Sequence, residues 1–287
     1  RLITGPASLS GVLIGGLMFG GGMVLARGCV SRLMVLGAGG NLRALITLSV
    51  FGLVAYATMK GPLGEVRAAL AGLTQIEGAD RLSVAAATGI GALGGLISGG
   101  ALMVLALALG AARGLTAGRA AAGVAIGAAV AATYGFTALL NGISFDPQPV
   151  RGLSFIAPTV NSASSLLGLH PGKIDVDMGL VPGVLIGALI VALAGRSFRL
   201  EWFASPGSAL RYLAGGAMMG FGGVLAGGCT MGNGVSGWAV YSTAALVALM
   251  AMVAGAALTD ALVDRPRTAR SVADAARLDP AAAVLSI

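Results

Sequence analysis

The sequence predicts an all-α integral membrane protein with an internal inverted repeat, and three features support this fold class. Of the 287 residues, 56% are hydrophobic and 10% are charged, whereas soluble domains carry about 25% charged residues. The apolar runs have the length of about 20 residues that a helix needs to cross a bilayer, and they lack the alternating pattern of an outer-membrane barrel. A glycine-rich segment ending in Gly-Cys occurs twice. We expect about seven to nine transmembrane helices, some of them short, re-entrant or broken.

Seven apolar runs define the expected elements, at 8–26, 43–59, 84–109, 119–140, 178–195, 209–227 and 235–262. An eighth segment, 152–169, contains Pro158, Asn161 and several serines and is too polar to face lipid. It is expected to be a buried broken helix, a re-entrant segment or an external loop. We expect 1–262 to form a single membrane domain, with repeat halves at about 1–140 and 150–262, and the polar residues 263–287 to form a flexible tail.

The net charge of +7 comes largely from arginines in short loops between apolar runs, a distribution that indicates membrane topology and not nucleic-acid binding. If 152–169 does not cross the membrane, the run at 209–227 is the sixth span and is antiparallel to the first. One side then collects 12 basic residues and the other six. The positive-inside rule makes the richer side cytoplasmic. That side holds Arg27, Arg32, Arg43, Arg113, Arg119, Arg196, Arg199, Arg211 and four arginines of the tail.

The repeat is visible without gaps when 15–35 is aligned with 215–235, where 11 of 21 positions are identical. Both cysteines of the chain, Cys29 and Cys229, fall at equivalent positions. Internal repeats in transport proteins place the substrate at the repeat interface near the midplane. A fainter third copy, 94–102, has Ala101 where the cysteine would stand.

Each Gly-Cys pair, Gly28-Cys29 and Gly228-Cys229, ends an apolar run and precedes a polar, glycine-rich stretch. A helix that stops within the bilayer leaves unpaired backbone groups that must face protein or a water-filled cavity. The N–H groups of the following helix suit an anion. We therefore expect two half-membrane hairpins whose thiols approach one another around a narrow path.

A thiol offers a weak S–H donor and a polarizable sulfur, so it can contact a sulfur-bearing ion. Arg27, which Gly227 replaces in the second copy, adds positive charge near one thiol, and Asn233 lies beside the other break. With two cysteines and one histidine in the chain, we expect no metal site. We expect no cofactor either.

The segments LMFGGGMVLARGCVSRLMVLGAGG, AMMGFGGVLAGGCTMGNGVSG and PGVLIGALIVALAGRSFRLEW resemble the YeeE/YedE sulfur transport family. The resemblance extends to about residue 260. It implies a multi-pass protein of the bacterial inner membrane that imports a sulfur-containing anion such as thiosulfate through a narrow central pore. It also implies Cys29 and Cys229 as relay residues and a TusA-like sulfur carrier protein as a partner. Thiosulfate importers of this family use a third cysteine, so Ala101 leaves open another sulfur anion or a path with two thiols.

Two other interpretations stay open at this point. The protein could be a membrane thiol-dependent sulfur transferase or oxidoreductase, which would need a reactive thiolate. It could also be a structural membrane subunit whose cysteines only pack.

Overall fold

The computed structural model describes residues 7–76, 92–112, 114–143, 152–166, 168 and 177–264. Apart from two strands of two residues each, β1 (Ala7–Ser8) and β2 (Gln75–Ile76), which pair antiparallel, the regular elements described there are helices. The predicted all-α class is confirmed. The helices are α1 (Leu9–Leu25), α2 (Val30–Ala38), α3 (Leu42–Lys60), α4 (Leu63–Gly72), α6 (Ala92–Ala112), α7 (Ala117–Ile143), α8 (Ile156–Leu166), α9 (Asp177–Ala194), α10 (Pro206–Leu225) and α11 (Thr243–Thr259), with π-helical turns η2 (Gly232–Gly237) and η3 (Asp260–Asp264).

Helices α1 and α10 cross antiparallel at the centre of the molecule, and glycines of each helix contact the backbone of the other. A Cβ atom placed on Gly15 would lie 2.5 Å from the amide nitrogen of Ala226, and one on Gly215 would lie 2.7 Å from that of Ala26. Since position 215 repeats position 15, and 226 repeats 26, the two contacts are the same contact seen from each copy. Small residues allow this close approach of backbones in a membrane.

The neighbouring contacts repeat in the same way. Helix α1 packs on α11 through Gly20, where an added Cβ would meet the carbonyl oxygen of Met252 at 2.0 Å. Helix α10 packs on α3 through Gly220, where it would meet the carbonyl oxygen of Phe51 at 2.7 Å. Each helix of the crossing thus contacts the long helix that follows the other copy's cysteine. The structure therefore contains the predicted inverted repeat, at least for α1–α2–α3 and α10–η2–α11, while the wider halves at 1–140 and 150–262 stay a prediction.

The core lies at this crossing. Four large side chains there are completely buried, and they form two pairs of equivalent positions: Phe19 with Met219, and Phe51 with Met252. Equivalent positions of the two repeat copies therefore fill the core together.

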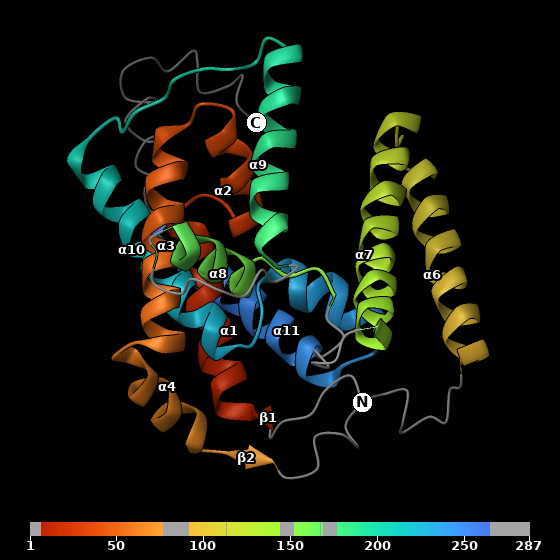
Figure 1. The fold of residues 1–287 in the computed structure, drawn as a ribbon, viewed down its shortest axis with the longest axis horizontal. Helices are drawn as coiled ribbons and strands as arrows, with labels where there is room; N and C mark the ends of the chain where they lie inside the picture. The colour runs from red at the N-terminus through yellow and green to blue at the C-terminus, as the bar shows by residue number, and fades with distance from the viewer. Residues whose placement is uncertain are drawn as a thin grey trace, which may run out of the picture.

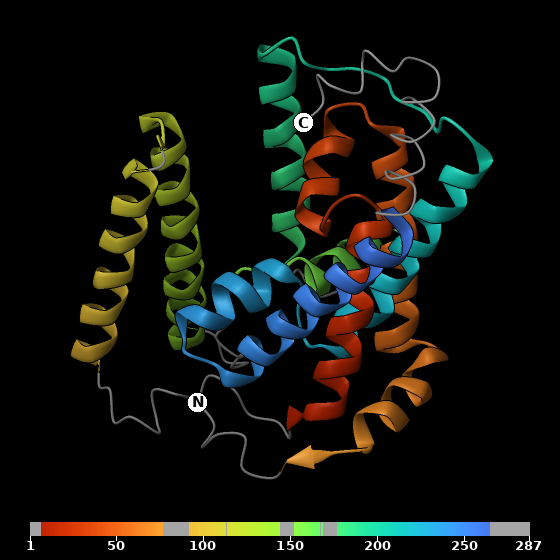
Figure 2. The same cartoon turned by 180° about the vertical axis from the view of Figure 1, so that it is seen from behind.

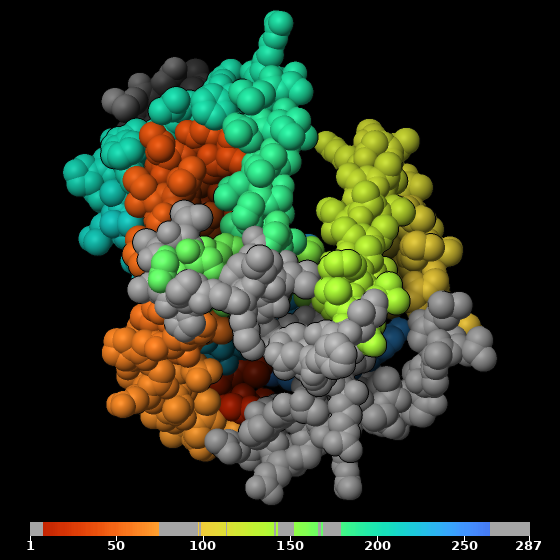
Figure 3. All heavy atoms as spheres, viewed as in Figure 1, coloured from red at the N-terminus to blue at the C-terminus, as the bar shows by residue number. Residues whose placement is uncertain are grey.

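Helices α6 and α7 lie side by side and apart from the central crossing in both ribbon views (Figures 1 and 2), and the space-filling view shows an open gap between α7 and α9 (Figure 3). Large apolar side chains on these two helices are exposed, such as Ile97 at 70% and Leu139 at 68%. This exposure fits a lipid-facing surface. Four described segments are long and apolar enough to cross a membrane: Leu9–Ala38, Leu42–Lys60, Ala117–Leu140 and Thr243–Asp264. The total of seven to nine spans stays a prediction.

One element prediction is wrong, and two further segments take a definite form in the structure. The run 235–262 is not one helix, because the chain turns at Tyr241, whose φ is 53°, and α11 begins only after Ser242 caps it. The segment 152–169 contains the short helix α8, in agreement with one of the expected alternatives; its 11 residues extend about 16 Å and are too short to span. The third copy, 94–102, lies inside α6, which continues past Ala101 to Ala112. Residues 84–91 of the run 84–109, and the tail beyond residue 264, lie outside the described residues.

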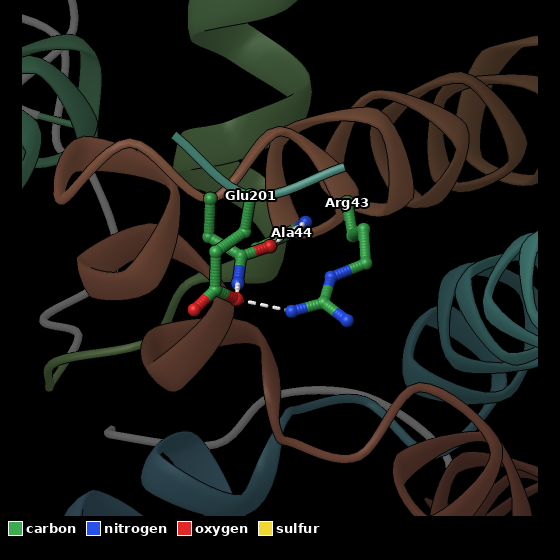
Figure 4. A network of polar contacts seen from close by, with 4 residues as sticks. Arg43, Ala44 and Glu201 are labelled. Carbon is green, nitrogen blue, oxygen red and sulfur yellow. Dashed lines mark hydrogen bonds and ion pairs between the residues drawn. The ribbon is translucent and has the colours of Figure 1, made fainter. Parts of the chain in front are cut away.

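An extended segment after α9 is bound through Glu201 to the start of α3 (Figure 4). Glu201 accepts from the side chains of Asn41 and Arg43, and Asn41 in turn caps α3 by accepting from the amide of Ala44. At the same end, Arg211 forms an ion pair with Asp264 at 2.8 Å and donates to the carbonyl oxygen of Val24. This end therefore gathers arginines of both repeat copies, as the positive-inside count predicts.

Candidate functional site

The first Gly-Cys motif forms the turn between α1 and α2. Helix α1 ends when Arg27 takes a left-handed conformation with φ 55°, and Cys29 is the N-cap residue of α2. The Cys29 Sγ lies 3.1 Å from the Ser31 Oγ. Cys29 is partly buried and Arg27 is exposed. The thiol thus stands at a helix N-terminus, where backbone N–H groups carry partial positive charge.

The second motif repeats this turn almost bond for bond. Gly227 takes the left-handed conformation with φ 73°, and the amide of Gly228 donates to the carbonyl oxygen of Gly223, as Gly28 does to Met23. Cys229 is 1% exposed, and its Sγ accepts from the amide of Gly232 at 3.4 Å. The predicted break of both apolar runs at Gly-Cys is confirmed.

The two copies differ after the cysteine by one residue. Asn41, which caps α3, lies twelve positions after Cys29, whereas Ser242, which caps α11, lies thirteen positions after Cys229. The π-helical turn η2 takes up the extra residue in the second copy. Such turns in helices occur frequently at functional sites, and here η2 carries Asn233.

The two motifs lie at opposite ends of the α1–α10 crossing. Ala226 packs beside Gly15 and Ala26 beside Gly215, and Ala26, the C-cap residue of α1, lies eleven positions after Gly15. At 1.5 Å per residue this is about 16 Å along the helix. The two turns therefore begin on opposite sides of the core layer, and the close approach of the two thiols stays a prediction.

A cavity of about 1050 Å³ lies at the second motif. Its wall comes from the first turn of α1, α4, α7, the segment 152–158, the end of α10, and η2 with the start of α11. The described lining residues include no aspartate or glutamate. The polar ones are Ser8, Arg67, Thr133, Tyr134, Thr137, Ser154, Asn233, Ser236 and Ser242.

Asn233 stands between this cavity and Cys229. It lines the cavity, and its side-chain amide lies over Gly228, where an added Cβ would meet the Nδ2 atom at 2.9 Å. Its backbone amide donates to the carbonyl oxygen of Cys229 at 2.8 Å. Asn233 is 8% exposed, and its Nδ2 donor has no hydrogen-bond partner within the described chain. Asn233 thus places a covered, unpaired donor next to the cavity.

The turn η2 is held firmly in place around Asn233. The Ser236 Oγ donates to the carbonyl oxygen of Leu153 at 2.7 Å, and the Tyr134 Oη donates to the carbonyl oxygen of Ser236 at 2.9 Å. Helix α7 and the segment before α8 thus fix the wall of the cavity. Among the described residues, no group of three or more histidine, cysteine, aspartate or glutamate side chains could hold a metal ion.

The chain matches the family described as sulphur transport over residues 1–258. The chain belongs to the sulphur transport family. It is 36% identical over 104 residues to the thiosulfate transporter TsuA of Escherichia coli K12, an alignment that covers 36% of this chain and 29% of that protein. It is 28% identical over 248 residues to the thiosulfate transporter TsuA of Spirochaeta thermophila, covering 81% of this chain and 71% of that protein.

Membership of the sulphur transport family, together with the apolar helices, makes this a multi-pass membrane protein. The family and the names of both relatives indicate a transport protein and not an enzyme, which removes the sulfur transferase and oxidoreductase interpretation.

Sequence reasoning found Cys29, Cys229, Gly28, Gly228, Arg27 and Asn233, and the structure places three of them around each turn. It missed other residues that line the cavity: Arg67 of α4 and Ser154, which come from distant segments, and Ser236, which lies in η2 with Asn233. In the sequence, Arg67 is one of the six basic residues on the side that is poor in arginine. Its position in a ten-residue helix with Glu65 gives no local signal that it faces a cavity.

Proposed function

We propose that this protein carries a sulfur-containing anion, with thiosulfate as the first candidate, across the bacterial inner membrane along a path that passes both Gly-Cys motifs. The observation that carries the proposal is the repeated turn, which presents one thiol at a helix start on each side of the α1–α10 crossing. The names of the two relatives supply the candidate substrate. Residues 1–262 would form the single transport domain.

The surroundings of the thiols support weak and reversible contacts with an anion. The Cys229 sulfur accepts from the amide of Gly232, so its own S–H remains available to donate. An oxyanion within an apolar protein is costly unless it is hydrogen-bonded, and several weak donors in series allow it to bind and also to leave. Neutral thiols fit this requirement because they need little desolvation and interact well with soft sulfur.

The separation of the motifs favours two successive stations over one shared site. With about 16 Å along α1 between the turns, an ion would contact Asn233 and Cys229 on one side of the core and Cys29 on the other. Arg27, exposed at the Cys29 turn, would supply positive charge there. The arginine-rich end is the cytoplasmic one in this proposal, and a TusA-like sulfur carrier would receive sulfur at that end.

The test is growth of a transport-deficient bacterial host on thiosulfate as its sole sulfur source. Wild type is expected to restore growth, and Cys29→Ser and Cys229→Ser are expected to reduce it at equal protein abundance in the membrane. Ser49→Ala changes an exposed hydroxyl of α3 and serves as the control variant. Growth of both cysteine variants at the wild-type rate would remove the thiols from the path.

A further inference from the structure

The cavity beside Cys229 contains a cationic group that the family motif does not predict. Arg67 reaches this cavity from α4 and contributes to its lining. Its Nε atom is fully covered and has no hydrogen-bond partner in the part of the chain described here. An unsatisfied buried donor costs about 1–3 kcal/mol, and more when the group is charged, so this arrangement requires a reason.

Asn233 lines the same cavity, and its covered Nδ2 is a second donor without a partner in the described part of the chain. Arginine offers five N–H donors and no acceptor, and the described lining includes no carboxylate. The charged residue among the described lining residues is thus a cation, which favours an acceptor-rich, negatively charged solute in this cavity. At about 1050 Å³ it is much roomier than a five-atom anion such as thiosulfate needs, so it resembles a vestibule more than a closed binding site.

Arg67 also gives the second motif a nearby positive charge that its own turn lacks. The first motif has Arg27 within its own turn, while the second has Gly227 at that position. Helix α4 follows α3, whose 19 residues run from Leu42, next to Arg43 at the arginine-rich end, to Lys60 at the opposite end. Arg67 is thus at the end of the molecule that is poor in arginine, next to the motif without its own cation.

We propose that this cavity is the outer vestibule of the transport path and that Arg67 is its capture residue, which draws the sulfur oxyanion from solution and delivers it to Asn233 at the Cys229 turn. This inference rests on the proposed transport function and names a residue and a step within it. A cation in the wall of a concave, low-dielectric cleft attracts an anion more strongly than one on an open surface. Its removal should therefore weaken capture and leave the later passage intact.

The experiment measures the concentration dependence of labelled thiosulfate uptake into proteoliposomes. Arg67→Gln is expected to raise KM about tenfold or more, because a hydrogen bond to a charged group is lost, with maximal uptake close to wild type. Arg67→Lys should recover part of that loss, since it keeps the charge but not the fork of donors. Lys60→Gln removes a charge from the same end, at an exposed residue that is not among the cavity-lining residues, and should leave KM unchanged.

Ionic strength provides a second readout. The KM of wild type should rise between 10 mM and 150 mM salt as screening shortens the range of the Arg67 charge, and this rise should be smaller in Arg67→Gln. Thermal unfolding of each variant in detergent checks that the fold is kept.

The outcomes separate the two proposals. If wild type takes up no thiosulfate, the transport proposal itself fails. If uptake depends on the cysteines but Arg67→Gln keeps the wild-type KM and salt dependence, only the capture role is overturned. If Arg67→Gln keeps the wild-type KM but anionic lipid no longer stabilises the protein, the guanidinium binds a lipid headgroup. That result also overturns the capture role of Arg67.

Discussion

The contact between Gly15 and the end of α10 gives the sharpest test of the central crossing. In Gly15→Ala, the new methyl group would lie 2.5 Å from the Ala226 amide nitrogen, 2.6 Å from the Gly222 carbonyl oxygen and 2.9 Å from the Leu225 carbonyl carbon. All three atoms belong to backbone, so no side chain can rotate away. The turn that leads into Cys229 must move instead.

The size of the effect follows from these distances. Ordinary contacts to a Cβ atom begin near 3.4 Å, so α1 and α10 must separate by about 1 Å. Overpacking of this kind costs roughly 1–3 kcal/mol, against which the better helix propensity of alanine returns at most about 1 kcal/mol. Since each kcal/mol shifts the unfolding midpoint of a chain of this size by roughly 2–4 °C, a loss of several degrees is expected.

Thermal unfolding in detergent, followed by circular dichroism, measures this loss. The equivalent variant Gly215→Ala would place its methyl 2.7 Å from Ala26 and 2.8 Å from Gly22, so it should lower the midpoint by a similar amount. Gly127→Ala is the matched control, because an added Cβ at this helical position of α7 meets nothing within 4 Å. Its midpoint should stay level or rise.

Equal midpoints for Gly15→Ala and Gly127→Ala would refute the close crossing. A loss at Gly15 with none at Gly215 would refute the two-fold relation between the copies, because the inverted repeat requires both contacts.

Three further variants test the ends of the molecule. Arg211→Gln, at a side chain that is 9% exposed and paired with Asp264, should cost about 1.5–3 kcal/mol and lower the midpoint in the same unfolding assay. Glu201→Gln weakens the more exposed ion pair with Arg43 and should cost about 1 kcal/mol or less, so a larger drop in the midpoint would contradict that assignment. Arg27→Gly relieves a left-handed conformation worth about 1 kcal/mol. This variant should unfold at a higher temperature and yet take up thiosulfate more slowly, and unchanged uptake would exclude Arg27 from the path.

Features of the fold that depend on a local sequence pattern could be predicted from the sequence. The Gly-Cys turns were predictable because a glycine-rich apolar run, repeated with its cysteine, requires a helix end at the same place in both copies. The antiparallel relation followed from counting spans. The break near Tyr241 was not predictable in this way, because the few polar residues near it do not interrupt a mostly apolar run and the turn is set by the π-helical insertion and the Ser242 cap.

The site was predictable only where it is local. Cys29, Cys229 and Asn233 stand in or beside the repeated motif, whereas Arg67 comes from a different element and reaches the cavity through the packing of α4 on α1 and α3. The 16 Å between the two turns also depends on how far α1 and α10 overlap. The glycine contacts of the crossing set that overlap. The residue spacing within one repeat copy does not reveal it.

Uptake of radiolabelled thiosulfate by proteoliposomes containing purified protein tests the transport path most directly. Initial rates for Cys29→Ser and for Cys229→Ser are expected to fall at least about tenfold below wild type, the factor that corresponds to about 1.4 kcal/mol, because each thiol is a separate station. Wild-type rates in both variants, in vesicles with equal protein content, would contradict a path that runs past the two repeated cysteines.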